Sequence, residues 1–285
     1  MINKFRPQSK ISNNLFEIPD SIFSRLGNAT TFFRTLSTNP IWKVLIEHKY
    51  FYLKIQNLSG NEERFLELEY RILSTLYTDL EITFFDNHEF AFLLVPELSQ
   101  NKCLNYGQLF AYLDTLIPNI DNASSFVPRQ RSFLVLLEQA ELALDLFSSQ
   151  KLIQSHWIDD LSEAIRALRE HHIQSRKIIC HGDVSSRNIY NFHGSLILLD
   201  WEDCFWGYDG FDYVYWLTFI NNMDQLSQSS IERIPIEVRL IRASYLLIVL
   251  LKEFLHFNNY EAKSRMTLET RLALFDSRIP NKYSL

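Results

Sequence analysis

The sequence predicts an α+β chain of two lobes, a small antiparallel sheet with one helix followed by a larger, mostly helical lobe. The first hundred residues contain several runs rich in β-branched and aromatic residues around one helical run. Long amphipathic runs dominate from residue 105 onward, and short strand-like runs return between residues 177 and 200. The composition of 47% apolar and 22% charged residues is that of a soluble globular protein.

The N-terminal lobe is expected to contain five strands. Short polar breaks such as STNP and HK suit the turns between the first three runs, so antiparallel pairing follows, and Pro96 ends the last run. The predicted strands cover residues 30–36, 41–47, 50–55, 80–85 and 89–98.

One helix is predicted inside this lobe, over residues 59–77. Its apolar residues recur at helical intervals and are Phe65, Leu68, Ile72 and Leu76. At 100° per residue Glu69 falls inside the apolar stripe, whereas Glu67 points away from it. We therefore expect Glu67 to be a solvated surface charge and Glu69 to need a partner.

The chain changes character near Leu98 to Gln100, which divides it into an N-terminal lobe, 1–98, and a C-terminal lobe, 99–285. A turn at His193 and Gly194 predicts a hairpin in the second lobe. Its expected helices are 105–117, 129–150, 156–173 and most of the chain after 212, and its expected strands are 177–180, 188–192 and 195–200.

Charge and cysteine content exclude some function classes. The net charge of −6 argues against a nucleic-acid partner and suits a cationic small molecule better. The three cysteines form no CxxC pair and are interpreted as reduced thiols of a cytoplasmic protein. The N-terminus lacks the apolar stretch of a secretory signal, and the longest apolar run, Tyr245 to Leu251, is too short to cross a bilayer.

Polar residues gather at the ends of the predicted hairpin. The stretch HGDVSSRN covers residues 181–188, and Asp200 follows the next apolar run. The hairpin should bring Asn188 and Asp200 to one end, with Asp183 on the preceding loop. Two or three hard oxygen ligands suit Mg²⁺, and phosphoryl transfer needs one further carboxylate that orients the attacking hydroxyl and accepts its proton.

This pattern, HxDxxxxN followed by a short hairpin and an apolar-D-W-E segment, resembles the catalytic core of the aminoglycoside phosphotransferase and choline kinase superfamily, relatives of the protein kinases. The segment FWGYDGFDYVYWL also resembles the GFD segment of choline and ethanolamine kinases. The resemblance is carried by residues 181–212. It implies a bilobal protein-kinase-like fold that binds ATP and Mg²⁺, with adenine held by the backbone near Val95 to Leu98.

The resemblance implies a role for each residue of the motif. Asp183 is the expected catalytic base, and Asn188 and Asp200 are the expected Mg²⁺ ligands. Arg187 is expected to reach a phosphate. Glu202 is assigned either to the surroundings of the metal or to the substrate.

Four further residues are expected to support this site. His181 would hold the catalytic loop, and Asp212 would cap the next helix and brace the loop from below. The superfamily also pairs a lysine on its third strand with a helix glutamate, and Lys54 and Glu69 occupy those places. Periodicity alone singles out Glu69, so two lines of evidence agree.

The chain departs from the superfamily in the loop that covers the phosphates. This loop is usually glycine-rich, yet no glycine lies between Gly27 and Gly60. Ser37 and Thr38 are expected to donate hydroxyl groups instead. The departure motivates an alternative function, a pseudokinase that acts as a nucleotide-sensing or partner-binding module.

The favoured function is ATP-dependent transfer of a phosphoryl group to a hydroxyl of a small molecule, either an amino alcohol such as choline or ethanolamine or an aminoglycoside or other sugar. A protein kinase is disfavoured, because Asp212 lies only twelve positions after Asp200. The aromatic residues of this segment either hold a cationic acceptor over their rings or pack in the core, and we favour packing. They are Phe205, Trp206, Tyr208, Phe211, Tyr213, Tyr215 and Trp216.

Overall fold

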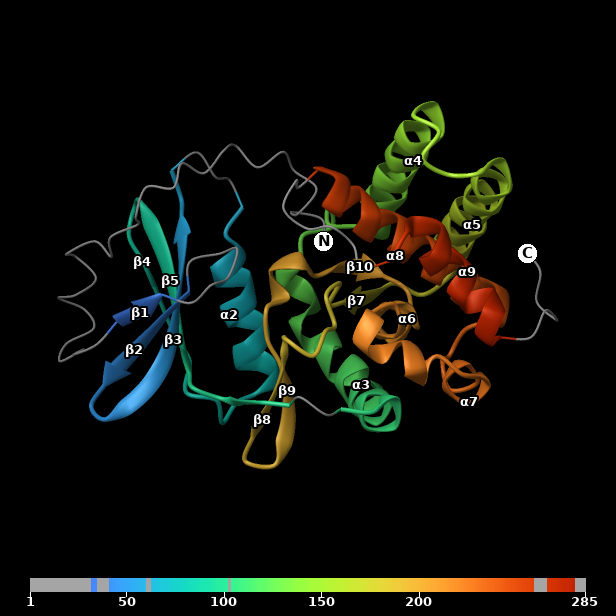
Figure 1. Cartoon of the computed structure of the whole chain (residues 1–285). Helices are drawn as coiled ribbons and strands as arrows, with labels where there is room; N and C mark the ends of the chain where they lie inside the picture. Colours follow the sequence, from blue (N-terminus) through green and yellow to red (C-terminus); the bar gives the residue numbers. More distant parts are fainter. Residues whose placement is uncertain (1–31, 35–40, 60–62, 102–103, 259–265, 280–285) are drawn as a thin grey trace.

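The computed structural model describes residues 32–34, 41–59, 63–101, 104–258 and 266–279. These residues form two lobes, with the strands β1 to β5 and helix α2 on one side and the helical lobe on the other (Figure 1). The hairpin β8–β9 projects from the second lobe close to helix α2 (Figure 1). The predicted bilobal α+β fold is confirmed.

The sheet of the first lobe has five antiparallel strands in the order β1-β2-β3-β5-β4. Glu47 and His48, both at positive φ, form the tight turn between β2 and β3. The five predicted strands are all present, although β4 begins three residues later than expected. Their bounds are β1 Phe32–Arg34, β2 Ile41–Ile46, β3 Lys49–Asn57, β4 Thr83–Asp86 and β5 Phe90–Pro96.

Helix α2, Phe65–Leu76, is shorter than the predicted run of 59–77. Its apolar stripe packs into the main core of the molecule, while the other side of the sheet has a small core of its own around Val44 and Phe92. Glu69 is fully buried as its position in the stripe predicts. Glu67 is partly buried, because Arg64 and Arg71 both pair with it.

The second lobe is mostly helical, as predicted. Its longer helices are α3 Tyr106–Ile120, α4 Phe133–Ser149, α5 Ser155–Gln174, α8 Val238–Asn258 and α9 Leu268–Arg278, and its short ones are α6 Phe211–Leu217 and α7 Gln228–Ile231. Pro118 does not end α3, contrary to expectation. The helix continues for two more residues because Ile120 extends the buried stripe that includes Leu113 and Leu116.

Short strands frame the motif residues. The predicted hairpin is present, with β8 Ile189–Phe192 paired to β9 Ser195–Leu198 through His193 and Gly194, both at positive φ. Strand β6, Ser99–Gln100, extends the hairpin on its other edge. Strand β10, Phe205–Gly207, pairs with β7, Ile178–Cys180, and was not expected from the sequence.

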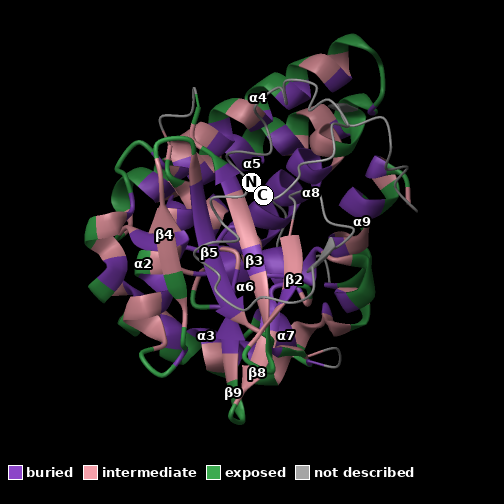
Figure 2. Ribbon diagram, turned by 90° about the vertical axis from the view of Figure 1, so that its left-hand side faces the viewer, coloured by how far each residue is buried: buried purple, intermediate pink, exposed green. Residues whose placement is uncertain are grey.

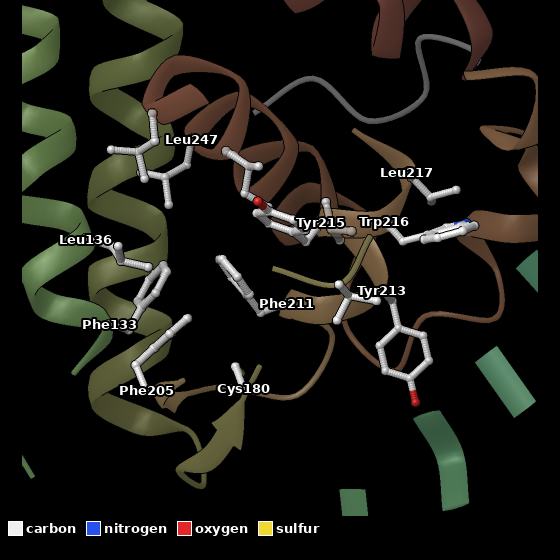
Figure 3. Close-up of a cluster of buried hydrophobic side chains, with 14 of the residues drawn as sticks. Phe133, Leu136, Cys180, Phe205, Phe211, Tyr213, Tyr215, Trp216, Leu217 and Leu247 are labelled. Atoms are coloured by element: carbon white, nitrogen blue, oxygen red, sulfur yellow. The ribbon is translucent and has the colours of Figure 1, made fainter. Parts of the chain in front are cut away.

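The aromatic segment after the hairpin is buried in the core of the helical lobe (Figure 3). Phe133 of α4 packs edge-on against Tyr208 and Phe211, and Phe205 stacks beside it. The packing interpretation of this segment is therefore the correct one for most of its rings. In Figure 2 buried positions are concentrated in the interior, and most exposed positions lie at the periphery. No helix of the described ranges is long and apolar enough to span a bilayer.

Candidate active site

The loop that precedes Asp183 is held from below by Asp212. The backbone N–H groups of His181 and Gly182 donate to the two carboxylate oxygens of Asp212, at 2.7 and 3.1 Å. The ring of His181 joins this loop to the hairpin, because its Nε2 lies 2.9 Å from the carbonyl oxygen of Leu199. Burial lowers the pKa of His181, so the ring stays neutral and its Nδ1 accepts from the N–H of Asp183.

Asp183 is contacted on both carboxylate oxygens. The hydroxyl of Tyr215 donates to Oδ1 at 2.8 Å. The side-chain amide of Asn188 lies 3.3 Å from Oδ2 and also donates to the backbone oxygen of Asp183 at 2.9 Å. The proposed base is thus held in one orientation by two different elements.

Asn188 and Asp200 lie at the same end of the hairpin, as predicted. Ile189 is opposite Leu198, and the N–H of Leu199 donates to the backbone oxygen of Asn188 at 2.9 Å. Asp200 follows directly in the left-handed conformation, with φ of 73°. This conformation turns its N–H toward Oε1 of Glu69, at 2.8 Å.

Lys54 on β3 joins the two lobes. Its ammonium contacts both carboxylate oxygens of Glu69, at 2.9 and 2.8 Å, and Oδ1 of Asp200 at 2.9 Å. Burial opposes its charge, but Asp200 and Glu69 outweigh burial and raise the pKa of Lys54. The ammonium is therefore fixed in its charged form between a helix of one lobe and the hairpin of the other.

The pKa values of two acidic side chains near Lys54, Glu69 and Glu202, lie above their ordinary range. Burial, together with the charge of Asp200, raises the pKa of Glu69 against the opposing effect of Lys54. Burial and Asp200 likewise raise the pKa of Glu202 to about 8. Since the charge of Asp200 raises both pKa values, a cation bound beside these carboxylates would stabilise their charged forms.

The described contacts do not test the roles predicted for Arg187, Ser37 and Thr38, and they give Asp212 a different role. Arg187 is exposed and forms no ion pair within the described ranges. Ser37 and Thr38 fall outside the described residues. The expected capping role of Asp212 is wrong, since Gly210 is the N-cap of α6 and the Asp212 carboxylate accepts from the loop instead.

Two contributors to the site were not found from the sequence. Tyr215 was placed among the aromatic residues but not assigned to Asp183. Arg131, which is buried, donates to the backbone oxygen of Glu202 at 2.6 Å and so ties the start of α4 to the loop after the hairpin. The signal that could have found Tyr215 is its spacing of three residues after Asp212, which places both on one face of a helix. No sequence signal marks Arg131.

The side chains present fit a hard divalent cation. Asn188 and Asp200 offer amide and carboxylate oxygens, the ligand type that Mg²⁺ prefers when substrate phosphates and water complete its shell. Within the described part of the chain, no group of three or more His, Cys, Asp or Glu residues forms a metal site by itself. The protein side chains would therefore supply only part of the coordination.

The model of one known protein family matches part of the chain. The model of the phosphotransferase enzyme family matches residues 91–230, which is just under half of the chain and includes the whole motif. No curated protein sequence matches the chain.

Solved structures of kinases share the fold over most of the chain. Choline kinase LicA from Streptococcus pneumoniae is 12% identical, covers 88% of this chain and 94% of its own, and has a TM-score of 0.58. Aminoglycoside phosphotransferase APH(4)-Ia, solved with ADP and hygromycin B, is 12% identical with coverages of 91% and 97% and a TM-score of 0.57. A putative fructosamine-3-kinase from Haemophilus somnus is 14% identical with coverages of 87% and 91% and a TM-score of 0.55.

The family match and the shared fold agree with the motif of residues 181–212. Together they confirm the resemblance to the aminoglycoside phosphotransferase and choline kinase superfamily, whose bilobal protein-kinase-like fold this chain adopts.

Proposed function

We propose that the protein is an ATP-dependent phosphotransferase that moves the γ-phosphoryl group to a hydroxyl of a small molecule. The observation that carries this proposal is the bridge made by Lys54, which contacts Glu69 of one lobe and Asp200 of the other. Asn188 is opposite the residue before Asp200 across the hairpin, and its side-chain amide contacts Asp183. Phosphoryl transfer needs this combination of a cation for the phosphates, oxygen ligands and a separate carboxylate.

Each side chain has a role in the proposed reaction. Asp183 orients the acceptor hydroxyl and accepts its proton as the bond between the acceptor oxygen and the γ-phosphorus forms. The bond from the γ-phosphorus to the bridging oxygen breaks, and ADP leaves with the electron pair. Lys54, steadied by Glu69, would hold phosphate oxygens.

The magnesium ion would be held by Asn188 and Asp200, with Glu202 in its surroundings, and when bound it would neutralise charge on the phosphates. Adenine would be bound by the backbone between Val95 and Leu98. Four of the similar structures contain adenine nucleotides, two with ADP, one with AMP and one with AMP-PNP, which supports nucleotide binding in this fold.

The aromatic rings of the second lobe do not distinguish between the two proposed acceptor classes, because cations of this chain already lie over several of them. Lys252 lies over the rings of Tyr215 and Phe219, and Arg129 lies over Trp206. Because these ring faces are already occupied, they do not favour a quaternary ammonium acceptor over a sugar. We therefore place sugars and aminoglycosides beside choline and ethanolamine in the test set, since similar structures contain hygromycin B and spectinomycin.

The experiment combines an acceptor screen with an Asp183→Asn variant. Formation of ADP from Mg·ATP is followed with choline, ethanolamine, sugars and aminoglycosides as acceptors. We expect turnover with at least one of them, and a loss of about 100-fold or more in Asp183→Asn with nucleotide binding retained. Asp145→Asn, on an exposed face of α4, is the matched control.

An Asp183→Asn variant that formed ADP at the rate of the parent protein would show that the base is wrongly assigned. Thermal unfolding with and without Mg·ATP separates the enzyme from the pseudokinase alternative, because a ligand that binds only the folded state raises its apparent stability. Binding without turnover of any acceptor would favour the pseudokinase. The same measurement with EDTA shows whether nucleotide binding needs the metal.

A further inference from the structure

The Asp183 carboxylate is contacted by helix α6 as well as by Asn188. Tyr215 of this helix is 4% exposed, and its hydroxyl donates to Oδ1 of Asp183. Asn188 approaches the other carboxylate oxygen from the loop. The torsion angle that sets the direction of the Asp183 carboxylate is therefore restrained from two sides.

Tyr215 is itself held by a buried ammonium from helix α8. Nζ of Lys252 lies 3.9 Å from the centre of the Tyr215 ring and 3.6 Å from that of Phe219. It also donates to the hydroxyl of Thr218 at 2.5 Å, and that hydroxyl donates to the backbone oxygen of Tyr215 at 2.6 Å. Lys252 is only 9% exposed, so the ring faces are strong partners for its charge.

These contacts form one continuous chain from α8 to the proposed base. Lys252 fixes the ring of Tyr215, and Tyr215 fixes Oδ1 of Asp183. Neither residue belongs to the HGDVSSRN stretch or to the segment around Asp200. The proposed reaction depends on the direction of the Asp183 carboxylate, because proton acceptance requires the acceptor hydroxyl within hydrogen-bond reach.

We propose that Tyr215 and Lys252 are positioning residues for Asp183 during phosphoryl transfer, an inference that rests on the proposed function. The Tyr215 hydroxyl holds Oδ1 and so limits the directions in which the Asp183 carboxylate can meet the acceptor hydroxyl. The proton of the acceptor hydroxyl passes to Asp183 as the new oxygen–phosphorus bond forms and ADP departs. Without the restraint the carboxylate samples orientations that do not accept the proton.

The first test is Tyr215→Phe, with Tyr213→Phe as its matched control. Tyr213 lies on the same helix, is similarly buried, and donates its hydroxyl to Asp114 at 2.6 Å rather than to the site. The two side chains point away from each other in Figure 3. Release of phosphate from Mg·ATP with water as acceptor is the assay.

Tyr215→Phe should lower kcat by about 10- to 100-fold and leave KM for Mg·ATP unchanged, because the nucleotide does not depend on the direction of Asp183. Tyr213→Phe should stay within about twofold of the parent. A parent kcat in Tyr215→Phe overturns the proposal. So does an equal loss in both variants, or a rise in KM that accounts for the whole effect, since either result indicates a structural role.

The second test removes the ammonium with Lys252→Ala and returns it with propylammonium chloride. Propylammonium replaces the atoms that the substitution deletes, and 1-propanol of the same shape lacks the charge. We expect propylammonium, and not 1-propanol, to restore kcat, and Lys252→Arg to retain most of it. Absence of rescue in a Lys252→Ala protein that unfolds cooperatively would count against the role of the charge.

Failure of the proposed function has a different signature. A parent protein that shows no thermal shift with Mg·ATP and consumes no ATP with any acceptor would contradict the proposed function. The positioning role would then fall with it. A parent protein that turns over, combined with an unaffected Tyr215→Phe, removes only the positioning role.

Discussion

Lys54 and Glu69 form a buried ion pair across the first lobe, with Nζ 2.8 Å from Oε2 of a glutamate that is 0% exposed. Lys54 comes from β3 and Glu69 from α2, so the pair fixes the distance between sheet and helix. The same ammonium reaches Asp200 on the hairpin of the second lobe. One lysine therefore sets both the helix position and the relation of the first lobe to the proposed metal ligands.

Replacing Lys54 alone should lower the free energy of unfolding. Lys54→Met leaves the Glu69 carboxylate buried with the N–H of Asp200 as its remaining partner. Breaking a buried pair by removing one member typically costs about 3 to 5 kcal/mol, whereas replacing both members by apolar residues costs much less. We expect Lys54→Met/Glu69→Leu to be more stable than Lys54→Met in urea unfolding.

The pair formed by Lys43 and Glu97 is the control for this prediction. Their side chains are 30% and 39% exposed, and such surface pairs contribute about 0 to 1 kcal/mol. Lys43→Met should therefore change the free energy of unfolding by less than Lys54→Met does. If Lys43→Met and Lys54→Met were equally destabilised, the buried Lys54–Glu69 pair would contribute no more to stability than a surface pair.

Gly182 and Gly194 offer a second comparison. Both have nearly the same positive φ, 83° and 85°. A Cβ at Gly182 would lie 2.9 Å from the backbone oxygen of Asp203 and 3.1 Å from the ring of Phe205, whereas nothing lies within 4 Å of a Cβ at Gly194. The two alanine variants therefore share the backbone strain and differ in the steric clash.

Gly194→Ala should lower the free energy of unfolding by about 1 kcal/mol or slightly more, the usual cost of an alanine in the left-handed conformation. Gly182→Ala should lower the free energy of unfolding by more than Gly194→Ala does. It should also reduce ADP formation, because the clash displaces the loop that carries Asp183. Urea unfolding and the ADP assay measure the two effects. An equal loss of stability in both variants would mean that the loop relaxes without cost.

The sequence was sufficient for those parts of the fold that local patterns determine. Alternation and turn residues predicted all five strands of the first sheet, and the 3.6-residue period placed Glu69 in the buried stripe of α2. Hairpin geometry brought Asn188 and Asp200 to one end. These features depend on residues that are close in sequence or that repeat with a fixed period.

Contacts that depend on tertiary packing were not predictable in this way. Tyr215 reaches Asp183 because α6 packs under the loop, and Arg131 reaches the backbone of Glu202 from the start of α4. Asp212 looked like a helix cap because acidic residues favour the first turn. In the structure its carboxylate instead accepts hydrogen bonds from the backbone N–H groups of His181 and Gly182.

His172 on α5 predicts a dependence of stability on pH. Its side chain is 4% exposed, and its Nδ1 has no hydrogen-bond partner among the described residues. Burial, reinforced by the charges of Lys177 and His171, lowers its pKa to about 4. In the unfolded chain a histidine has a pKa of about 6.5.

Between these two pKa values the unfolded chain binds a proton at His172 and the folded chain does not. The contribution of His172 to stability is therefore fully present above about pH 6.5 and is lost as the pH falls toward about 4, by about 1 to 3 kcal/mol. His172→Leu should remove this part of the dependence and flatten the curve of unfolding free energy against pH.

Urea unfolding at half-unit steps from pH 4 to 8 measures the parent and His172→Leu. The difference between the parent and His172→Leu must change as the pH falls, because protonation of the parent's unfolded state is its source. A constant difference across this range would place the effect in packing rather than in titration, and His172 would then not be the acid-sensitive group.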